Sequence, residues 1–305
     1  MAPFLLIIAA FIKVDASPRA SPKSDLYEIR IPAAAIERTV DKFRRTRTLA
    51  TQKIYVLEGK VVAERFFFDD GNLAEEKLYR DYPDKLHGIW RQYHMNGKLA
   101  AERPYREGTM DGTFRFWDDN GDLLGESTIK EGTGMLRQFT NRALAVGDSE
   151  TSFVNGKKNG PATEWGRFPL CQGMGVHFSK YVDGKLQGWS ILRDEDGLLL
   201  SSAFIKRDQL HGVVREIDRE GRPRVGYPKY YLDGEEVTEF KYREAASRDK
   251  QLQELLDYQP PNYAKVPEAP SSIAAKRIGA EKTKRTGDDD PETTSAPPKP
   301  QSKPK

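Results

Sequence analysis

The glycines of this chain recur with a period of 24 residues. Gly97 and Gly121 each follow an asparagine and lie 24 residues apart, and two further glycine series keep the same spacing. All three series carry one insertion of four residues in the same stretch, between about 160 and 173. A shared period predicts tandem structural repeats, in which each unit needs its neighbours to bury its apolar side chains. The turn glycines that we expect are Gly71, Gly88, Gly97, Gly108, Gly112, Gly121, Gly132, Gly156, Gly160, Gly184, Gly188, Gly197, Gly212 and Gly221.

One glycine series marks hairpin turns. Asn96-Gly97 and Asn120-Gly121 lie between runs with the length and the aromatic content of strands, and such pairs favour tight turns in which both residues take positive φ. The other two series bracket a return turn, as in YREGTMDG (105–112). We therefore expect about seven hairpin units between Tyr55 and Val237. Gly125 lies off this period, so valine should be tolerated better there than at Gly97 or Gly121.

Two consecutive units show the pattern most completely. They read Gly88, Trp90, Tyr93, Gly97, Leu99, Tyr105, Gly108 and then Gly112, Phe114, Trp117, Gly121, Leu123, Ile129, Gly132. In these residues the chain resembles the variant MORN repeat (membrane occupation and recognition nexus) of bacterial proteins. The resemblance implies a mainly β fold, an elongated and twisted antiparallel sheet of stacked hairpins. It also implies binding to proteins or lipid surfaces. Some bacterial members are described as antitoxins, and the family supplies no catalytic residues.

The chain divides into five predicted regions. An apolar run at 4–12, followed by the small residues Val14 and Ala16, resembles a secretory signal peptide and is too short to span a bilayer. The alternative to the signal peptide is a buried N-terminal strand or a misassigned start codon. Helical patterns at 32–47 and 242–258 predict caps for the open ends of the sheet. The regions are 1–16 (signal peptide), 17–51 (linker and N-terminal capping helix), 52–240 (repeat sheet), 241–258 (C-terminal capping helix) and 259–305 (disordered tail rich in Pro and Lys).

The distribution of charge along the chain limits the classes of partner that the protein can bind. Residues 265–305 hold nine Lys or Arg and six Asp or Glu, so the whole formal excess of +3 lies in the tail. A neutral body argues against nucleic acid as a partner, and the tail could give only weak contact with anionic surfaces. With 31% charged residues and a mean hydropathy of −0.70, no transmembrane segment is predicted.

The sequence offers no catalytic, cofactor-binding or metal-binding residues. His87 and His211 occupy one repeat position, where Asp111 and Gln187 stand in other units, so polar turn residues are favoured over a metal site or a general base. Cys171 is the one cysteine, which excludes an internal disulfide. It lies near His177 in the sequence, but no oxyanion-binding motif accompanies the pair. We expect no cofactor.

Recurring aromatic residues are the candidates for binding. They either join neighbouring hairpins through cross-strand packing or line an exposed groove for an extended peptide or glycan, and both roles can coexist. The six residues are Trp90, Tyr93, Phe114, Trp117, Trp165 and Trp189.

The sequence favours a non-enzymatic repeat scaffold that presents a β-surface to a protein partner and is exported, to the periplasm or beyond. One alternative is an antitoxin-like neutralising protein in the cytoplasm. A second is a hydrolase or glycan-binding module on the same scaffold, which would need catalytic residues that converge in space.

Overall fold

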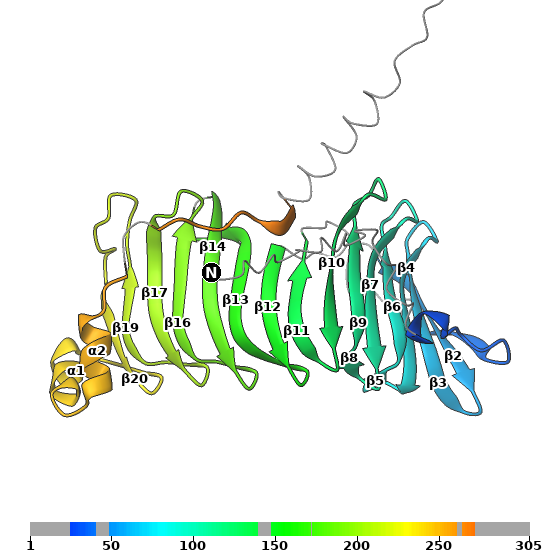
Figure 1. Cartoon of the computed structure of the whole chain (residues 1–305), viewed down its shortest axis with the longest axis horizontal. Helices are drawn as coiled ribbons and strands as arrows, with labels where there is room; N and C mark the ends of the chain where they lie inside the picture. The colour runs from blue at the N-terminus through cyan, green and yellow to red at the C-terminus, as the bar shows by residue number, and fades with distance from the viewer. Residues whose placement is uncertain (1–24, 41–48, 140–147, 172, 261–263, 272–305) are drawn as a thin grey trace, which may run out of the picture.

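The chain folds into one long antiparallel sheet that does not close on itself (Figure 1). The computed structural model describes residues 25–40, 49–139, 148–171, 173–260 and 264–271. Each main strand pairs with the main strand before it and the one after it, so the order in the sheet follows the chain. The prediction of a sheet of tandem hairpins is confirmed.

The strands run from two to twelve residues in length. They are β1 (Ile36–Val40), β2 (Leu49–Leu57), β3 (Lys60–Phe68), β4 (Leu73–Asp81), β5 (Lys85–Leu86), β6 (Gly88–Tyr93), β7 (Leu99–Arg106), β8 (Thr109–Met110), β9 (Gly112–Trp117), β10 (Leu123–Lys130), β11 (Thr133–Gln138), β12 (Asp148–Val154), β13 (Lys157–Phe168), β14 (Gly173–Val182), β15 (Lys185–Leu186), β16 (Gly188–Asp194), β17 (Leu199–Lys206), β18 (Gln209–Leu210), β19 (Gly212–Glu216), β20 (Lys229–Leu232) and β21 (Glu235–Val237). The two-residue strands β5, β8, β15 and β18 lie in the return turns and pair with the strand that precedes them.

The two kinds of turn differ from the prediction in one respect. At Asn96-Gly97 only the glycine takes positive φ (78°), and the glycine N–H donates to the carbonyl of His94 over 2.9 Å. This is a hairpin loop with a glycine bulge, so the expected positive φ at both residues is wrong for this series. Both residues are left-handed instead in the return turns, as at Glu107 (φ 52°) and Gly108 (φ 84°). All fourteen of the predicted turn glycines adopt positive φ.

Backbone hydrogen bonds link successive return turns. The N–H of Gly108 donates to the carbonyl of Leu86 over 2.7 Å, and the N–H of Gly132 donates to Met110 over 2.7 Å. The same bond recurs from Gly234 to Leu210 (2.8 Å), near the other end of the sheet. Each unit is therefore fixed to the next at its turn as well as along its strands.

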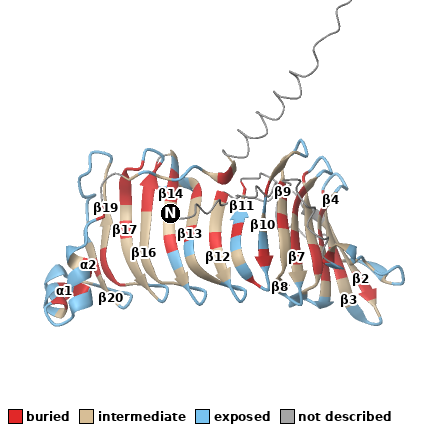
Figure 2. Ribbon diagram, in the orientation of Figure 1, coloured by how far each residue is buried: buried red, intermediate tan, exposed pale blue. Residues whose placement is uncertain are grey.

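The two faces of the sheet differ in chemistry. Successive side chains of a strand point to opposite sides, and directly paired residues point to the same side. We call the side that carries Arg91 and Glu102 the charged face and the side that carries Trp90 and Phe116 the opposite face. Buried residues are spread along the whole sheet in several clusters instead of one centre (Figure 2).

The N-terminal end is closed by a strand. We expected a capping helix over 32–47, but Ile36–Val40 form β1, which pairs with β2 from Ile36–Val56 to Val40–Gln52. Three of its five residues are β-branched, and the free edge of β2 offers backbone partners that a helix would leave unused. Residues 41–47 lie outside the described residues. Ahead of β1, the short helix η1 (Asp25–Glu28) lies beside β6 and β7.

The C-terminal end carries a helical cap, as predicted, but the cap consists of two helices. α1 (Glu239–Ala246) is capped by Thr238, and α2 (Lys250–Asp257) is capped by Asp249, which accepts from the N–H groups of Gln251 and Leu252. Tyr242 and Leu252 share a buried cluster with Val213 of β19 and Tyr230 of β20. The cap thus covers apolar side chains that the last unit would otherwise expose.

Part of the predicted disordered tail is attached to the sheet. Residues 264–271 lie across the ends of several strands and hydrogen-bond to them (Figure 1). The prediction of disorder from residue 259 is therefore wrong for this segment, because composition does not reveal contacts with distant strands. Residues 272–305 lie outside the described residues.

Candidate interaction surface

Six alternating charges cross the charged face on six adjacent strands. We call them the charged row; they are Arg65, Glu76, Arg91, Glu102, Arg115 and Glu126. Their N···O distances along the row are 2.7, 3.3, 3.3, 3.9 and 3.2 Å. The inner members are the least exposed, with side-chain exposure of 13% for Glu102 against 54% for Glu126. Each inner charge has an opposite charge on both sides, so the row is neutral and is satisfied within the sheet.

The segment around η1 covers part of this row. The hydroxyl of Tyr27 donates to the carbonyl of Thr113 (2.8 Å) and accepts from Nη1 of Arg115 (2.8 Å). Burial raises the pKa of Tyr27, while Arg115 opposes that shift. A pocket of about 430 Å³ lies between this segment and the row, lined by Tyr27, Glu28, Arg30, Arg91, Glu102 and Arg115.

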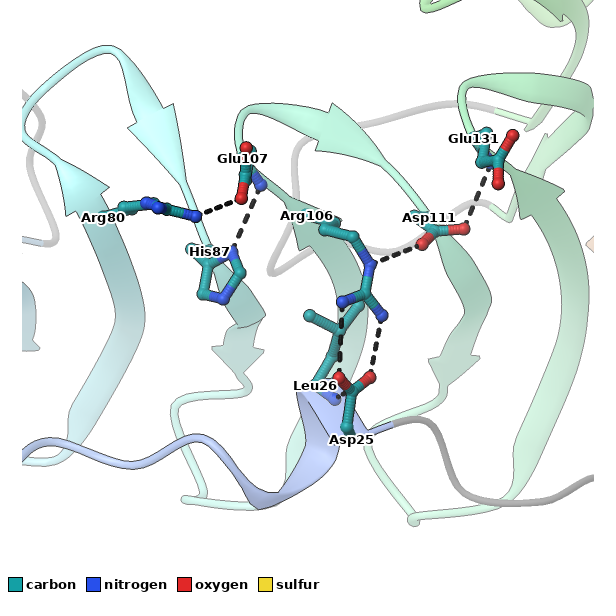
Figure 3. A network of polar contacts seen from close by, with 8 residues as sticks. All are labelled: Asp25, Leu26, Arg80, His87, Arg106, Glu107, Asp111 and Glu131. Carbon is teal, nitrogen blue, oxygen red and sulfur yellow. Dashed lines mark hydrogen bonds and ion pairs between the residues drawn. The ribbon is translucent and has the colours of Figure 1, made fainter.

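Figure 3 shows how this segment and the return turns are joined. Arg106 forms ion pairs with Asp25 (2.7 Å) and with Asp111 (3.0 Å), and both carboxylates raise its pKa. The carboxylate of Asp111 also accepts from the backbone N–H of Glu131 over 3.1 Å, in the next return turn. His87 makes the equivalent contact one unit earlier, since its Nδ1 accepts from the N–H of Glu107 over 3.2 Å.

The repeat position of His87 has one structural task. Gln187 accepts from the N–H of Arg207 (3.0 Å), and Nδ1 of His211 accepts from the N–H of Asp233 (3.2 Å). His, Asp and Gln all offer an acceptor there, which explains why the residue type varies. The interpretation of His87 and His211 as polar turn residues agrees with these contacts.

On the opposite face, Trp90 lies between two cations. Nζ of Lys77 lies 4.9 Å from its ring centre, and the guanidinium of Arg103 also lies 4.9 Å away. Arg103 is only 6% exposed and lies 5.5 Å from the ring of Phe116, and burial lowers its pKa. Among the described residues no ion-pair partner for Arg103 is found. Its Nη1, Nε1 of Trp90 and Oε1 of Gln92 are buried without a hydrogen-bond partner.

The comparison with protein families places this region in a known class. A model of the MORN repeat variant matches residues 86–107 and 110–131, in tandem. The chain therefore carries tandem MORN repeats. No curated protein matches the chain. The two matched MORN repeats include β6–β10, and with them Trp90, Arg103, Phe114 and most of the charged row. The remaining hairpins continue the same sheet outside the matched residues.

The six candidate aromatic residues, of which Trp165 and Trp189 lie outside the matched repeats, do not form one groove. Trp90 and Phe114 are the second residues after the first glycine of their units and lie on the opposite face. Phe114 is fully buried between Tyr105 and the core, so it cannot contact a partner. By strand alternation the other four, Tyr93, Trp117, Trp165 and Trp189, belong to the charged face.

A serine and a histidine converge on the opposite face of β14 and β16, which sequence reasoning missed. Nε2 of His177 lies 2.7 Å from Oγ of Ser190, and Nδ1 lies 3.9 Å from Glu164. Ser190 is paired with Ala203 of β17, and the next residue, Ile191, is paired on both sides. Cys171 lies apart from this pair in a buried apolar cluster, and burial raises the pKa of its thiol.

The described residues show neither a metal-binding cluster nor a membrane-spanning helix. No group of three or more His, Cys, Asp or Glu side chains is arranged to hold a metal ion there. Within the same residues, no helix has both the length and the apolar character needed to cross a membrane.

Proposed function

We propose that this MORN-repeat chain is a non-enzymatic scaffold that binds a protein partner through its opposite face over β4–β9. The observation that carries the proposal is the group of three buried polar atoms without partners: Nε1 of Trp90, Oε1 of Gln92 and Nη1 of Arg103. Each such atom costs about 1–3 kcal/mol while it is unsatisfied. All three are enclosed in the free chain, so a partner gains that free energy only where neighbouring side chains move aside on binding.

An extended peptide segment has the complementary chemistry. Trp90 and Arg103 are directly paired across β6 and β7 and both offer N–H donors, while Gln92, two residues further along β6, offers an acceptor. A peptide backbone supplies a carbonyl and an N–H in every residue, and so can meet both needs. MORN repeats commonly serve as protein- or membrane-interaction modules, which supports a scaffold role.

The test compares binding by conservative variants of the full chain. Trp90→Phe with Gln92→Leu removes one donor and one acceptor but retains the bulk of both side chains. Trp117→Phe is the matched control, because it makes the same aromatic change on the charged face. We expect affinity capture from the native host, quantified by mass spectrometry, to lose at least about tenfold of the specific partner with the first variant and none with the control. Equal capture by all three chains would contradict the proposal.

We further propose that the protein is exported. The apolar run at 4–12 and the small residues Val14 and Ala16 support this, and the mature chain should then begin at Ser17. Intact mass of the native protein decides between export and the antitoxin alternative, because a full-length cytoplasmic product would favour the neutralising role.

The hydrolase alternative rests on the contact between Ser190 and His177. A hydrolase needs donors for the developing oxyanion, and Ile191, the residue after Ser190, is paired within the sheet on both sides. We therefore expect a fluorophosphonate probe to leave Ser190 unlabelled. Labelling that is lost in Ser190→Ala would favour the hydrolase over the scaffold.

A further inference from the structure

Residues 264–271, with the sequence AKVPEAPS, cross the sheet and contact three separate units. We call this segment the strap. The N–H of Ala264 donates to the carbonyl of Gly197 (3.1 Å), in the turn between β16 and β17. Nε1 of Trp165 in β13 donates to the carbonyl of Pro267 (2.9 Å). Asp148, the first residue of β12, accepts from both the N–H of Ser271 (3.0 Å) and its hydroxyl. In Figure 1 the strap is the orange segment that crosses the ends of these strands.

The surface beneath the strap is built for a close approach of main chain. Trp165 is 7% exposed and Asp148 is 3% exposed, so the strap encloses both. A Cβ atom on Gly197 would lie 2.1 Å from the carbonyl oxygen of Ala264, whereas the equivalent Gly97 and Gly221 have open space around them. Of these three hairpin turns, only the one at Gly197 has the strap packed against its glycine, and a side chain there would collide with the strap backbone.

The strap is recognised mainly through its backbone. Two of its N–H groups and one carbonyl make these contacts, together with the hydroxyl of Ser271. Pro267 restricts the backbone within the irregular stretch 264–269, whereas Pro270, which is buried, begins a helical turn with Ser271. Aromatic-lined surfaces bind proline-containing peptides in other proteins, and here an indole N–H donates to the carbonyl of a proline.

We propose that Asp148, Trp165 and Gly197 form a binding site for an extended, proline-containing segment of a partner protein, and that the strap occupies this site in the free chain. The site lies on the charged face, so it is separate from the surface proposed above and does not depend on it. The ligand must supply a carbonyl that accepts from the indole N–H of Trp165. It must also supply an N–H and a neighbouring hydroxyl that both donate to the carboxylate of Asp148.

The residues just before the strap indicate that the strap binds the sheet of its own chain and not the sheet of a second copy. Tyr258 stacks on Trp189 with ring centres 4.2 Å apart, and Nη2 of Arg215 donates to the carbonyl of Leu256 (2.9 Å). These contacts hold the start of the strap close to its site, which favours self-occupation over exchange with a second copy. A partner must therefore displace the strap, and its apparent affinity falls by the fraction of chains in which the site is open.

The experiment uses full-length chains and a fluorescein-labelled peptide of sequence AKVPEAPS, followed by fluorescence anisotropy. Pro270→Asp places a charge at a buried strap position beside Asp148 and should release the strap. Lys265→Asp is the matched control, because it introduces the same residue at an exposed strap position. We expect Pro270→Asp to bind the peptide at least tenfold more tightly than the wild type, and Lys265→Asp to bind like the wild type.

A second substitution tests the site itself. Adding Trp165→Phe to Pro270→Asp removes only the indole donor and should weaken peptide binding about fivefold or more. Circular dichroism checks that each variant is folded. Hydrogen exchange of the wild-type chain gives an independent measurement, since excess peptide should increase exchange within 264–271. Equal affinity of wild type and Pro270→Asp, no effect of Trp165→Phe, or a wild-type dimer that exchanges its straps would each overturn the proposal.

Discussion

Gly97 and Gly125 belong to neighbouring units but exclude side chains for different reasons. Gly97 has φ of 78° and open space around its Cα, so a side chain there meets only backbone strain. Gly125 is not among the residues with positive φ, but a Cβ atom there would lie 2.2 Å from Cζ of Phe139. The glycine period predicts the first kind of requirement. It cannot predict the second, which depends on a residue that follows β11.

We predict that Gly125→Val destabilises the protein at least as much as Gly97→Val, which reverses the expectation from the sequence. Forcing extra atoms against Phe139 should cost about 1–3 kcal/mol or more through overpacking, and a branched residue at positive φ costs about 1–3 kcal/mol. Chemical denaturation of both variants gives the comparison. A Gly125→Val protein within about 0.5 kcal/mol of the wild type would contradict this account of the packing.

His211 should make stability depend on pH. Burial, with a contribution from Lys206, lowers the pKa of its imidazole, and its Nδ1 accepts a backbone hydrogen bond that requires the neutral ring. The unfolded chain therefore takes up a proton first as the pH falls through about 6.5, and the folded state loses stability from there down to the folded pKa. The loss is at most about 1.4 kcal/mol per pH unit.

The substitution His211→Gln separates this effect from general acid sensitivity. Gln187 already fills the equivalent position in another unit and makes the same kind of hydrogen bond. We expect urea unfolding to show a smaller loss of stability between pH 7.5 and 5.5 in the variant than in the wild type. Parallel losses in the two proteins would show that His211 does not titrate with folding.

Strand pairing brings together charges that the sequence leaves apart. Glu102 meets Arg91 across one hairpin and Arg115 in the next, and both contacts require the correct register of three strands. The glycine period locates these strands but does not supply their register, because the bulges shift the pairing by one residue. The charged row was therefore beyond prediction from single residues. The same holds for β1, whose pattern matches a helix until the free edge of β2 is considered.

The position of a charge within the row should decide its contribution to stability. Glu102→Gln leaves two Arg side chains with a weaker partner at a site that is 13% exposed, and we expect a loss of about 1–3 kcal/mol. Glu126→Gln removes an end member that is 54% exposed, where solvent screening limits the loss to about 1 kcal/mol or less. Denaturation in low and high salt measures both, and equal losses would mean that the row does not act as a connected network.

At the scale of the whole molecule the sheet is a linear array whose parts touch mainly their neighbours. Stability in such an array is close to a sum over units and their interfaces. The strap and the η1 segment are exceptions, because each joins units that are not adjacent. Tyr27 and Thr113 are 86 residues apart in the chain, and Ser271 and Asp148 are 123 apart. Such long-range contacts should make distant units unfold together.

Truncation at two points tests whether the strap couples the array. A chain that ends at residue 271 keeps the contacts with Gly197, Trp165 and Asp148, whereas a chain that ends at 260 loses all of them. The lost hydrogen bonds and the exposure of Trp165 are offset by the freed conformational entropy of the strap, so we expect a net loss of about 1–2 kcal/mol. For a sheet of this size that corresponds to a melting temperature lower by roughly 2–6 °C in the chain ending at 260 than in the chain ending at 271. Calorimetry should also show a broader transition in the shorter chain, because the strap no longer links β12, β13 and the turn between β16 and β17. Identical melting curves for the two truncated chains would mean that the strap rests on the sheet without stabilising it.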